Sequence, residues 1–275
     1  MQSKHLNFEA KSLRKTVLRM AYAGSTVHIG CAFSIIEIVC VLYRNYLSFP
    51  DNNPDHDERN FFILSKGHGV MALYAAFYEM EWLNDFDIDN YFKDGTKLKG
   101  LSDSRVPGLE ATTGSLGHGF SVAVGIAYGL KKKNSDRLVF VLVGDGELNE
   151  GSVWEGILFA AHHKLHNLIL IVDVNGFQAM GSTSEIIELK NLYEKFKSFL
   201  FSVIEVDGHN ENEINLAIDK LLNENSNSPK VILANTIKGK GVPFMEGKNE
   251  WHYTRLNDKS YQEALGYLNS DENLQ

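Results

Sequence analysis

The chain contains 275 residues, of which 44% are hydrophobic, 23% are charged and 11% are aromatic. This composition is typical of a globular protein and argues against extensive disorder. The 27 Lys and Arg residues are outnumbered by 35 Asp and Glu, and the net charge of −8 provides no basic surface for nucleic acid or for an anionic membrane. No apolar segment is long enough to span a bilayer, and the N-terminus lacks the pattern of a secretory signal, so we expect a soluble cytoplasmic protein.

The first part of the chain is predicted to contain helices followed by a short strand. Apolar residues at helical spacing indicate one helix over about the first 20 residues and a second, mostly buried one over 33–47, with a loop over 24–30 between them. The apolar run 60–65 has the length of a strand and is followed by a glycine-flanked turn over 66–69 and a helix that reaches Met80.

The middle of the chain contains the clearest structural unit. The fully apolar run 137–143 predicts a strand that ends at Gly144-Asp145-Gly146, a helix follows over about 151–164, and a second apolar strand over 167–172 ends near Asn175. This pattern is a βαβ crossover, in which the two strands are parallel neighbours. A glycine-rich segment over 113–119 and a helix rich in small residues over about 120–132 precede it.

The remaining segments continue the alternation of strands and helices. Further strands are predicted over 201–206 and 230–235, with a helix over 211–223 between them and a polar helix near the C-terminus. Strands that are apolar on both faces belong to parallel sheets covered by helices on both sides. The sequence therefore predicts an α/β fold, a doubly wound and mainly parallel sheet with helices on both faces, formed by a single domain over 1–275.

Two predicted strand ends offer oxygen ligands for a metal. Asp145 supplies a carboxylate, Asn175 an amide oxygen and Phe177 a backbone carbonyl, and parallel neighbours place these groups at one edge of the sheet. Such ligands suit Mg²⁺ or Ca²⁺, and Mg²⁺ is favoured because it completes its shell with water and phosphate oxygens. Gly-Asp-Gly after a strand is also a frequent tight turn, so the metal interpretation depends on Asn175.

Two common nucleotide-binding motifs are excluded. Asn149 stands where a dinucleotide-binding GxGxxG motif would need its third glycine after Gly144 and Gly146, and the Gly-Lys-Ser or Gly-Lys-Thr of a P-loop does not occur. The two cysteines, Cys31 and Cys40, lack the spacing of a zinc site and are expected to be buried, reduced thiols.

The run from Gly144 to Glu155, with 160–165 and 167–176, resembles the thiamine diphosphate motif of transketolases. Other segments match in the family's order, namely His28-Ile-Gly30, Ser65-Lys-Gly-His-Gly-Val70, Pro107-Gly-Leu-Glu110, Thr113-Gly-Ser-Leu-Gly117, Asn235-Thr-Ile-Lys-Gly-Lys-Gly-Val242 and Glu250-Trp-His252. The resemblance covers about residues 15 to 256 and therefore nearly the whole chain.

The resemblance implies a role for individual residues. Asp145, Asn175 and the carbonyl of Phe177 would hold Mg²⁺, for which Ca²⁺ or Mn²⁺ can substitute, against the diphosphate of thiamine diphosphate. The residues implied in cofactor binding are His68, Gly114, Ser115, Leu116, Gly117, Gly144, Gly146, Glu147, Asn175 and His252. Those implied in catalysis are His28, His68, Glu150, Glu155 and His252, with His28 facing the substrate and the two glutamates joining a carboxylate network across a subunit interface.

Length indicates what kind of transketolase this chain resembles. A fused transketolase continues into a pyrimidine-binding domain and a C-terminal domain, so the resemblance implies the N-terminal, diphosphate-binding subunit of a split, two-chain enzyme. A separate pyrimidine-binding chain would supply the glutamate that activates the cofactor, in an α₂β₂ heterotetramer that is active only as an assembly. The expected reaction transfers a two-carbon ketol unit from a ketose donor to an aldose acceptor, with sugars or sugar phosphates as substrates.

Several departures from the family's pattern point to an unusual substrate. Leu101 replaces an active-site histidine, His118 a glutamine, and Val27 and Tyr253 each a glycine. Leucine can neither donate a hydrogen bond nor transfer a proton, so we expect a modified or deoxygenated ketose in a specialised sugar pathway. The alternatives are a subunit of another thiamine diphosphate enzyme, such as a ketoacid dehydrogenase or a deoxyxylulose-phosphate synthase-like transferase, and a non-catalytic, cofactor-binding regulatory subunit.

Overall fold

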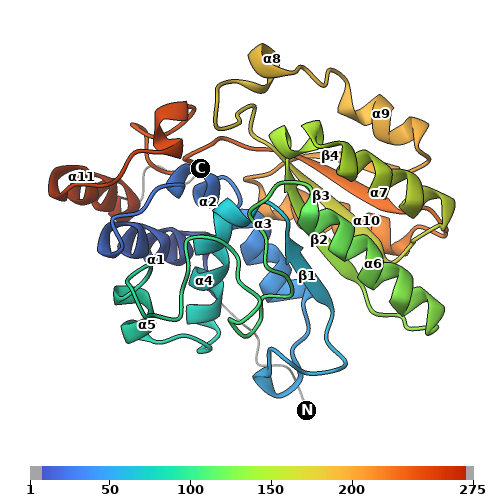
Figure 1. Ribbon diagram of the computed structural model, residues 1–275, viewed down its shortest axis with the longest axis horizontal. Coiled ribbons are helices and arrows are strands. Elements are labelled where there is room, and N and C mark those ends of the chain that lie inside the picture. Colours follow the sequence, from blue (N-terminus) through green and yellow to red (C-terminus); the bar gives the residue numbers. More distant parts are fainter. Residues whose placement is uncertain (1–7, 271–275) are drawn as a thin grey trace.

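A five-stranded parallel sheet forms the centre of the computed structural model, which describes residues 8–270 (Figure 1). The strands are β1 (Phe61–Leu64), β2 (Val139–Gly144), β3 (Leu168–Val174), β4 (Ser202–Asp207) and β5 (Lys230–Asn235). Their order in the sheet is β1-β2-β3-β5-β4, and every neighbouring pair is parallel. The predicted doubly wound α/β fold is therefore confirmed, and β2 and β3 are neighbours as the βαβ pattern requires.

Helices cover both faces of this sheet. They are α1 (Ala10–Ala23), α2 (Ile29–Phe33), α3 (Ile36–Val41), α4 (Val70–Glu79), α5 (Asp85–Asp89), α6 (His118–Lys132), α7 (Gly151–His162), α8 (Thr183–Ile186), α9 (Leu192–Ser198), α10 (Glu211–Asn223) and α11 (Asp258–Asn269). None of the helices within residues 8–270 is long and apolar enough to cross a membrane.

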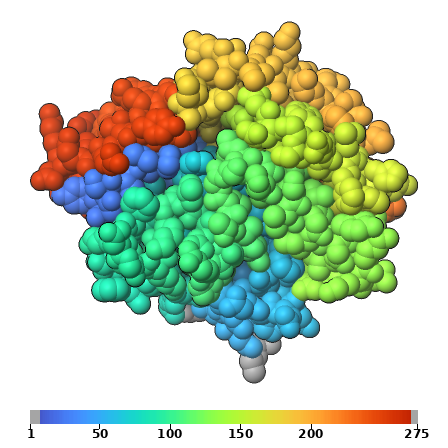
Figure 2. Space-filling view, viewed as in Figure 1, coloured from blue at the N-terminus to red at the C-terminus, as the bar shows by residue number. Residues whose placement is uncertain are grey.

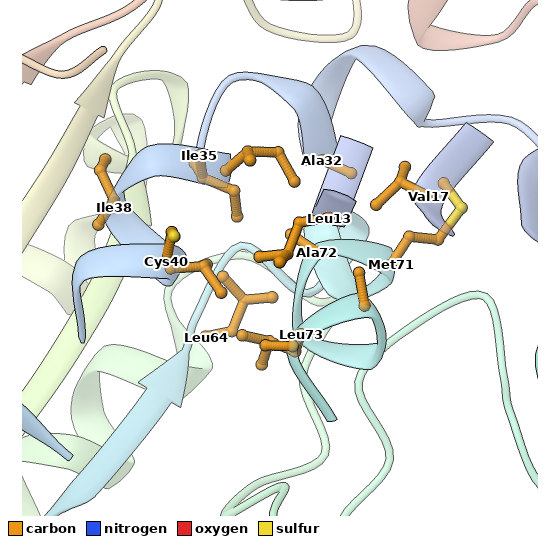
Figure 3. Packing of buried hydrophobic residues seen from close by; sticks show 14 of the residues in the cluster. Leu13, Val17, Ala32, Ile35, Ile38, Cys40, Leu64, Met71, Ala72 and Leu73 are labelled. Carbon is orange, nitrogen blue, oxygen red and sulfur yellow. The ribbon is translucent and has the colours of Figure 1, made fainter. Parts of the chain in front are cut away.

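Alternate residues of each strand enter two separate hydrophobic cores. Phe140 and Leu142 of β2 belong to the core that contains side chains of α1, α3, α4 and α10, part of which Figure 3 shows where α1 and α4 meet β1. Val139, Val141 and Val143 belong to the core formed with α6, α7 and α9. Because both sets of side chains are fully buried, β2 is apolar throughout, as the sequence pattern indicated.

The helix predicted over 33–47 is divided into shorter pieces. It begins earlier, at Ile29, inside the segment predicted as a loop, and it is interrupted at Ser34 and Ile35 before α3. The Ser34 hydroxyl donates to the buried Asp173 carboxylate at 2.8 Å and also to the Cys31 carbonyl. Hydrogen bonds from a serine hydroxyl to groups outside the regular helix can interrupt the helix. The spacing of apolar residues does not reveal such a break. The predicted start of the first helix lies outside the described residues.

A buried ion pair joins the N-terminal helices to the end of the sheet. Arg14 of α1 is fully buried and donates to both carboxylate oxygens of Glu37 on α3, at 2.5 and 2.8 Å. Although burial raises the pKa of Glu37, Arg14 and His209 hold it at about 2. Arg14 also donates to the Lys240 carbonyl, and His209 accepts from the Ile237 N–H, so this cluster holds the loop after β5 in place.

Candidate functional site

The carboxyl ends of β2 and β3 bring the predicted metal ligands together. Asp145 follows β2, and its carboxylate accepts hydrogen bonds from the Gly176 N–H at 2.7 Å and from the Gly146 N–H at 2.8 Å. Gly176 lies between Asn175 and Phe177, so the aspartate directly contacts the turn that carries the other two predicted ligands. The crossover rule located these groups correctly because neighbouring parallel strands end at the same edge.

The residues at this edge fit a divalent cation. Asp145 is buried, and burial, followed by the nearby charge of Asp173, raises its pKa to about 6. A carboxylate in this position would be stabilised by a cation. Within residues 8–270 no three His, Cys, Asp or Glu side chains form a metal cluster, so the predicted set depends on the amide and carbonyl oxygens that Mg²⁺ also accepts.

A buried carboxylate behind Asn175 was missed in the sequence. Asp173 lies within β3, is fully buried and accepts hydrogen bonds from Lys66 Nζ, Ser34 Oγ, Asn175 Nδ2 and Thr236 Oγ1. Although burial raises its pKa, the Lys66 ammonium holds the pKa of Asp173 below the ordinary value. The available signal was a single acidic residue inside an otherwise apolar strand.

Asp173 determines which way the Asn175 amide points. A carboxylate can only accept hydrogen bonds, so the amide nitrogen of Asn175 must face it, at 2.7 Å. The amide oxygen then lies on the other side of the side chain, where it accepts from the Phe177 N–H at 3.0 Å. The protein itself therefore sets the orientation of this amide, with its oxygen facing away from Asp173.

Three histidines from distant segments form a cluster. The ring centroid of His28 lies 4.7 Å from that of His68 and 5.1 Å from that of His252. Burial lowers the pKa of His28 to about 4 and that of His252 to about 3, and it also lowers the pKa of His68. The imidazoles are therefore neutral at pH 7. The structure brings together the three histidines that the sequence placed in the site.

Lys238 is a second residue that the sequence analysis did not assign to the site. It is only 2% exposed, and its Nζ donates to Asn249 Oδ1 at 2.8 Å and lies 3.0 Å from His252 Nδ1. Nζ also lies 5.5 Å from the centre of the Phe177 ring. The sequence contained a signal, because Lys238 is followed by Gly239 and Gly241, and these two glycines have φ of +79° and +94° in the structure.

Glu147 holds the glycine segments in position. It is buried, and its carboxylate accepts from Ser65 Oγ at 2.5 Å, from the Gly117 N–H at 2.8 Å and from the Gly144 N–H at 3.2 Å. Gly117 has φ of +84°, a conformation that side chains rarely adopt. Glu147 therefore connects the end of β1, the segment before α6 and the end of β2.

The other residues implied in the site are more exposed. Ser115, Glu150 and Glu155 are exposed, and Gly114, Leu116 and Gly146 are half-buried. The backbone of Gly114 has φ of +150°. Glu150 immediately precedes α7, Glu155 lies within it, and both side chains are exposed.

The residues that depart from the family's pattern also lie around these segments. The Leu101 side chain packs over Gly114, where an added Cβ would meet Leu101 Cδ1 at 2.7 Å. The Tyr253 ring is 57% exposed and its centroid lies 4.6 Å from that of His252. Leu101 and Tyr253 therefore present apolar surface beside the glycine segment and the histidine cluster.

Replacing His28 by glutamine should change the pH dependence of stability. The pKa of His28 is 6.5 in the unfolded chain and about 4 in the folded protein. Because the unfolded chain binds the proton more readily, wild-type His28 lowers the free energy of unfolding by a growing amount as pH falls below 6.5. Relative to wild type, His28→Gln should therefore gain stability between pH 6.5 and 4, with an upper limit of about 1.4 kcal/mol per pH unit that solvent screening reduces.

Urea unfolding of both proteins at pH 7.5, 6 and 5 measures this difference. His162→Gln, an exposed histidine at the end of α7, serves as the control. A stability difference between His28→Gln and wild type that stays constant from pH 7.5 to 5 would contradict a lowered pKa at His28.

Comparison with known proteins gives consistent matches along the chain. The family model described as "Transketolase, thiamine diphosphate binding domain" matches residues 9–272. The 6-deoxy-6-sulfo-D-fructose transketolase subunit SqwG of Clostridium sp. (strain MSTE9) is 36% identical over 97% of this chain and 97% of that protein. An apulose-4-phosphate transketolase subunit of Actinobacillus succinogenes is 39% identical over 90% of this chain and 90% of that protein.

Solved structures show the same fold within longer chains. The transketolase of Leishmania mexicana superimposes with a TM-score of 0.85 at 25% identity, covering 96% of this chain and 42% of that one. The transketolase of Campylobacter jejuni superimposes with a TM-score of 0.84 at 28% identity, covering 98% of this chain and 44% of that one. The chain thus spans less than half the length of these solved proteins.

Proposed function

The chain belongs to the transketolase family through its thiamine diphosphate-binding domain, and we propose that it is the diphosphate- and Mg²⁺-binding subunit of a two-chain transketolase. The observation that carries this proposal is the edge of β2 and β3, where Asp145 contacts the Asn175-Gly176 turn beside three clustered histidines. The transketolase subunits similar to this chain, matched over 90% or more of their length, support the two-chain organisation.

The proposed reaction is transfer of a two-carbon ketol unit from a ketose to an aldose. When bound, thiamine diphosphate would supply the nucleophilic carbon and the electron sink that cleavage of a carbon–carbon bond requires. Ser65-Lys-Gly-His-Gly and Glu150-Gly-Ser-Val-Trp-Glu155 favour this reaction over those of ketoacid dehydrogenases and deoxyxylulose-phosphate synthases. No observation favours a purely regulatory subunit.

Each part of the site has a role in this proposal. Asp145, the Asn175 amide oxygen and the Phe177 carbonyl would hold Mg²⁺ against the diphosphate, with Gly146 beside it. Lys238 would add positive charge, so an acidic protein can bind an anion at this place. The neutral histidines would act as hydrogen-bond partners, with His28 directed to the substrate.

We further propose that a pyrimidine-binding chain docks on α6 and α7, in an α₂β₂ assembly. The segments of α6 and α7 lie side by side on the surface (Figure 2). They expose Val122, Leu158 and Phe159, and a Cβ added at Gly125 would meet no atom within 4 Å. An exposed apolar face with open glycine positions suits close packing of another chain. Glu155 lies on α7, and Glu150 is the residue that precedes its first turn.

Replacing Asp145 by alanine should abolish Mg²⁺-dependent cofactor binding, because it removes the only carboxylate among the proposed ligands. Isothermal titration calorimetry of the assembled protein with thiamine diphosphate and Mg²⁺ measures this loss. Asp136→Ala, an exposed aspartate before the opposite end of β2, should bind as wild type does. Unchanged affinity in Asp145→Ala would argue against the metal assignment.

The isolated chain should show no ketol transfer, whereas co-expression with a pyrimidine-binding chain from the same genome should produce activity.

Leu158→Asp should weaken assembly at least tenfold, because it places a charge in the proposed interface. Leu216→Asp on α10, where the leucine is 69% exposed against 56% for Leu158, should not. Analytical ultracentrifugation and a coupled assay test both points, and full activity of the isolated chain would refute the two-chain proposal.

We also propose that Leu101 adapts the enzyme to a modified or deoxygenated ketose. Sulfofructose and apulose phosphate in the names of two similar proteins support an unusual sugar. Leu101→His should shift donor preference toward ordinary ketose phosphates by about tenfold or more in kcat/KM, since one hydrogen bond is worth about 1.5 kcal/mol. An assay across a panel of donors measures this shift, and an unchanged ranking of donors would contradict the proposed role.

A further inference from the structure

We infer that Lys238 is a positioning residue that fixes the tautomer of His252, so that this imidazole offers an N–H donor to a bound ligand. The inference rests on the proposed function only for the identity of that ligand. Its basis is a chain of hydrogen bonds whose direction is determined at one end by a backbone carbonyl.

The chain of hydrogen bonds starts at the Ala179 carbonyl, beside the predicted metal-binding turn. A carbonyl oxygen can only accept, so the Asn249 amide presents its nitrogen to it, at 3.2 Å. The amide oxygen of Asn249 must then face the other way, where it accepts from Lys238 Nζ at 2.8 Å. The usual ambiguity of an amide orientation is therefore resolved by its neighbours.

The same reasoning continues to the imidazole. Burial lowers the pKa of Lys238 below its ordinary value, but as an ammonium this side chain has donors and no acceptor, and its Nζ lies 3.0 Å from His252 Nδ1. Nδ1 must therefore be the unprotonated, accepting nitrogen, which leaves the proton of the neutral ring on Nε2. The other neighbour of Nδ1, the thiol of Cys31, lies 3.8 Å away and is only a weak donor.

The backbone holds this ring among the other histidines. The carbonyl of His252 accepts from the His28 N–H at 3.0 Å, which fixes the segment before α2 to the end of the 3₁₀ turn at Asn249–His252. The rings of His28 and His252 are nearly perpendicular, with an interplanar angle of 89°. A rotation of the His252 ring would break its contact with Lys238 and disturb this packing.

The fixed tautomer has a chemical consequence. Nε2 lies across the ring from Nδ1, and the positive charge on Lys238 polarises its N–H. The side chain is thereby a neutral donor suited to an oxygen acceptor, either a phosphate oxygen of the cofactor or an oxygen of the ketose. If Nε2 were the unprotonated nitrogen instead, its lone pair would repel the phosphate oxygen and the ketose oxygen alike.

Selective ¹⁵N-histidine labelling of the full chain tests the inference without any ligand. Long-range ¹H–¹⁵N spectra at pH 7, with the His252 signals assigned through His252→Gln, should show a protonated Nε2 and an Nδ1 shifted by hydrogen bonding. Because this measurement uses the chain without cofactor, its outcome does not depend on transketolase activity. A protonated Nδ1 in the wild-type chain would overturn the inference, whether or not any variant folds.

Two variants separate hydrogen bonding from charge. In Lys238→Met the Nδ1 signal should move to the position of a free nitrogen, and a share of the Nδ1–H tautomer should appear. In Lys238→Gln the amide N–H can still donate, so the wild-type tautomer should persist without the charge. Identical Nδ1 shifts in Lys238→Met and wild type would show that the lysine does not determine the tautomer.

Adding ligands to the wild-type assembly then identifies the acceptor. A displaced Nε2 signal on addition of Mg²⁺ and thiamine diphosphate indicates the cofactor, and a displacement that appears only on later addition of a ketose indicates the substrate. A signal that moves with neither would refute the donor role of His252.

Discussion

The Asp173 carboxylate is the interaction on which the arrangement of the site depends. It is fully buried in β3, and four side chains donate to it, from Ser34 before α3, Lys66 after β1, Asn175 after β3 and Thr236 after β5. A buried charge costs several kcal/mol unless it is paired and fully hydrogen-bonded, so these segments are held together at one point. The same segments lead into the histidine cluster, the predicted metal turn and the Lys238 loop, whose positions relative to each other follow from this carboxylate.

Charge in the site is distributed in an unusual way for an acidic protein. The positive charge near the histidines is carried by Lys66 and Lys238, both buried, while burial keeps the three imidazoles neutral at pH 7. Lys66 is balanced by Asp173, whereas Lys238 is hydrogen-bonded to two neutral side chains. Burial lowers the pKa of Lys238, so a bound anion would stabilise its ammonium form, and Asp145 favours a cation. A magnesium diphosphate combines both in one ligand.

The residues proposed to adapt the substrate are separate from the buried network that holds the site. The groups proposed to hold the cofactor come from strand ends and tight glycine loops, which the buried network fixes firmly. The positions that depart from the family's pattern, Leu101 and Tyr253, are exposed and pack beside these loops without taking part in the network. Substitutions there leave the buried network intact, because exposed loop positions on a rigid scaffold tolerate change more readily than its core.

The sequence by itself determined the architecture and which candidate residues meet at one edge of the sheet. Strands that are apolar on both faces, alternating with helices, allow few topologies, and the crossover rule then places Asp145 beside Asn175. The predicted fold and family are both confirmed, whereas the roles of the site residues stay predictions. Only the tertiary structure revealed that Lys66 pairs with Asp173, that Ser34 interrupts a helix, that Glu147 is buried while Glu150 is exposed, and that Lys238 contacts His252. Local patterns carry no record of these features, because Ser34 and Lys66 lie 139 and 107 positions from Asp173, and such pairings depend on how the whole chain packs.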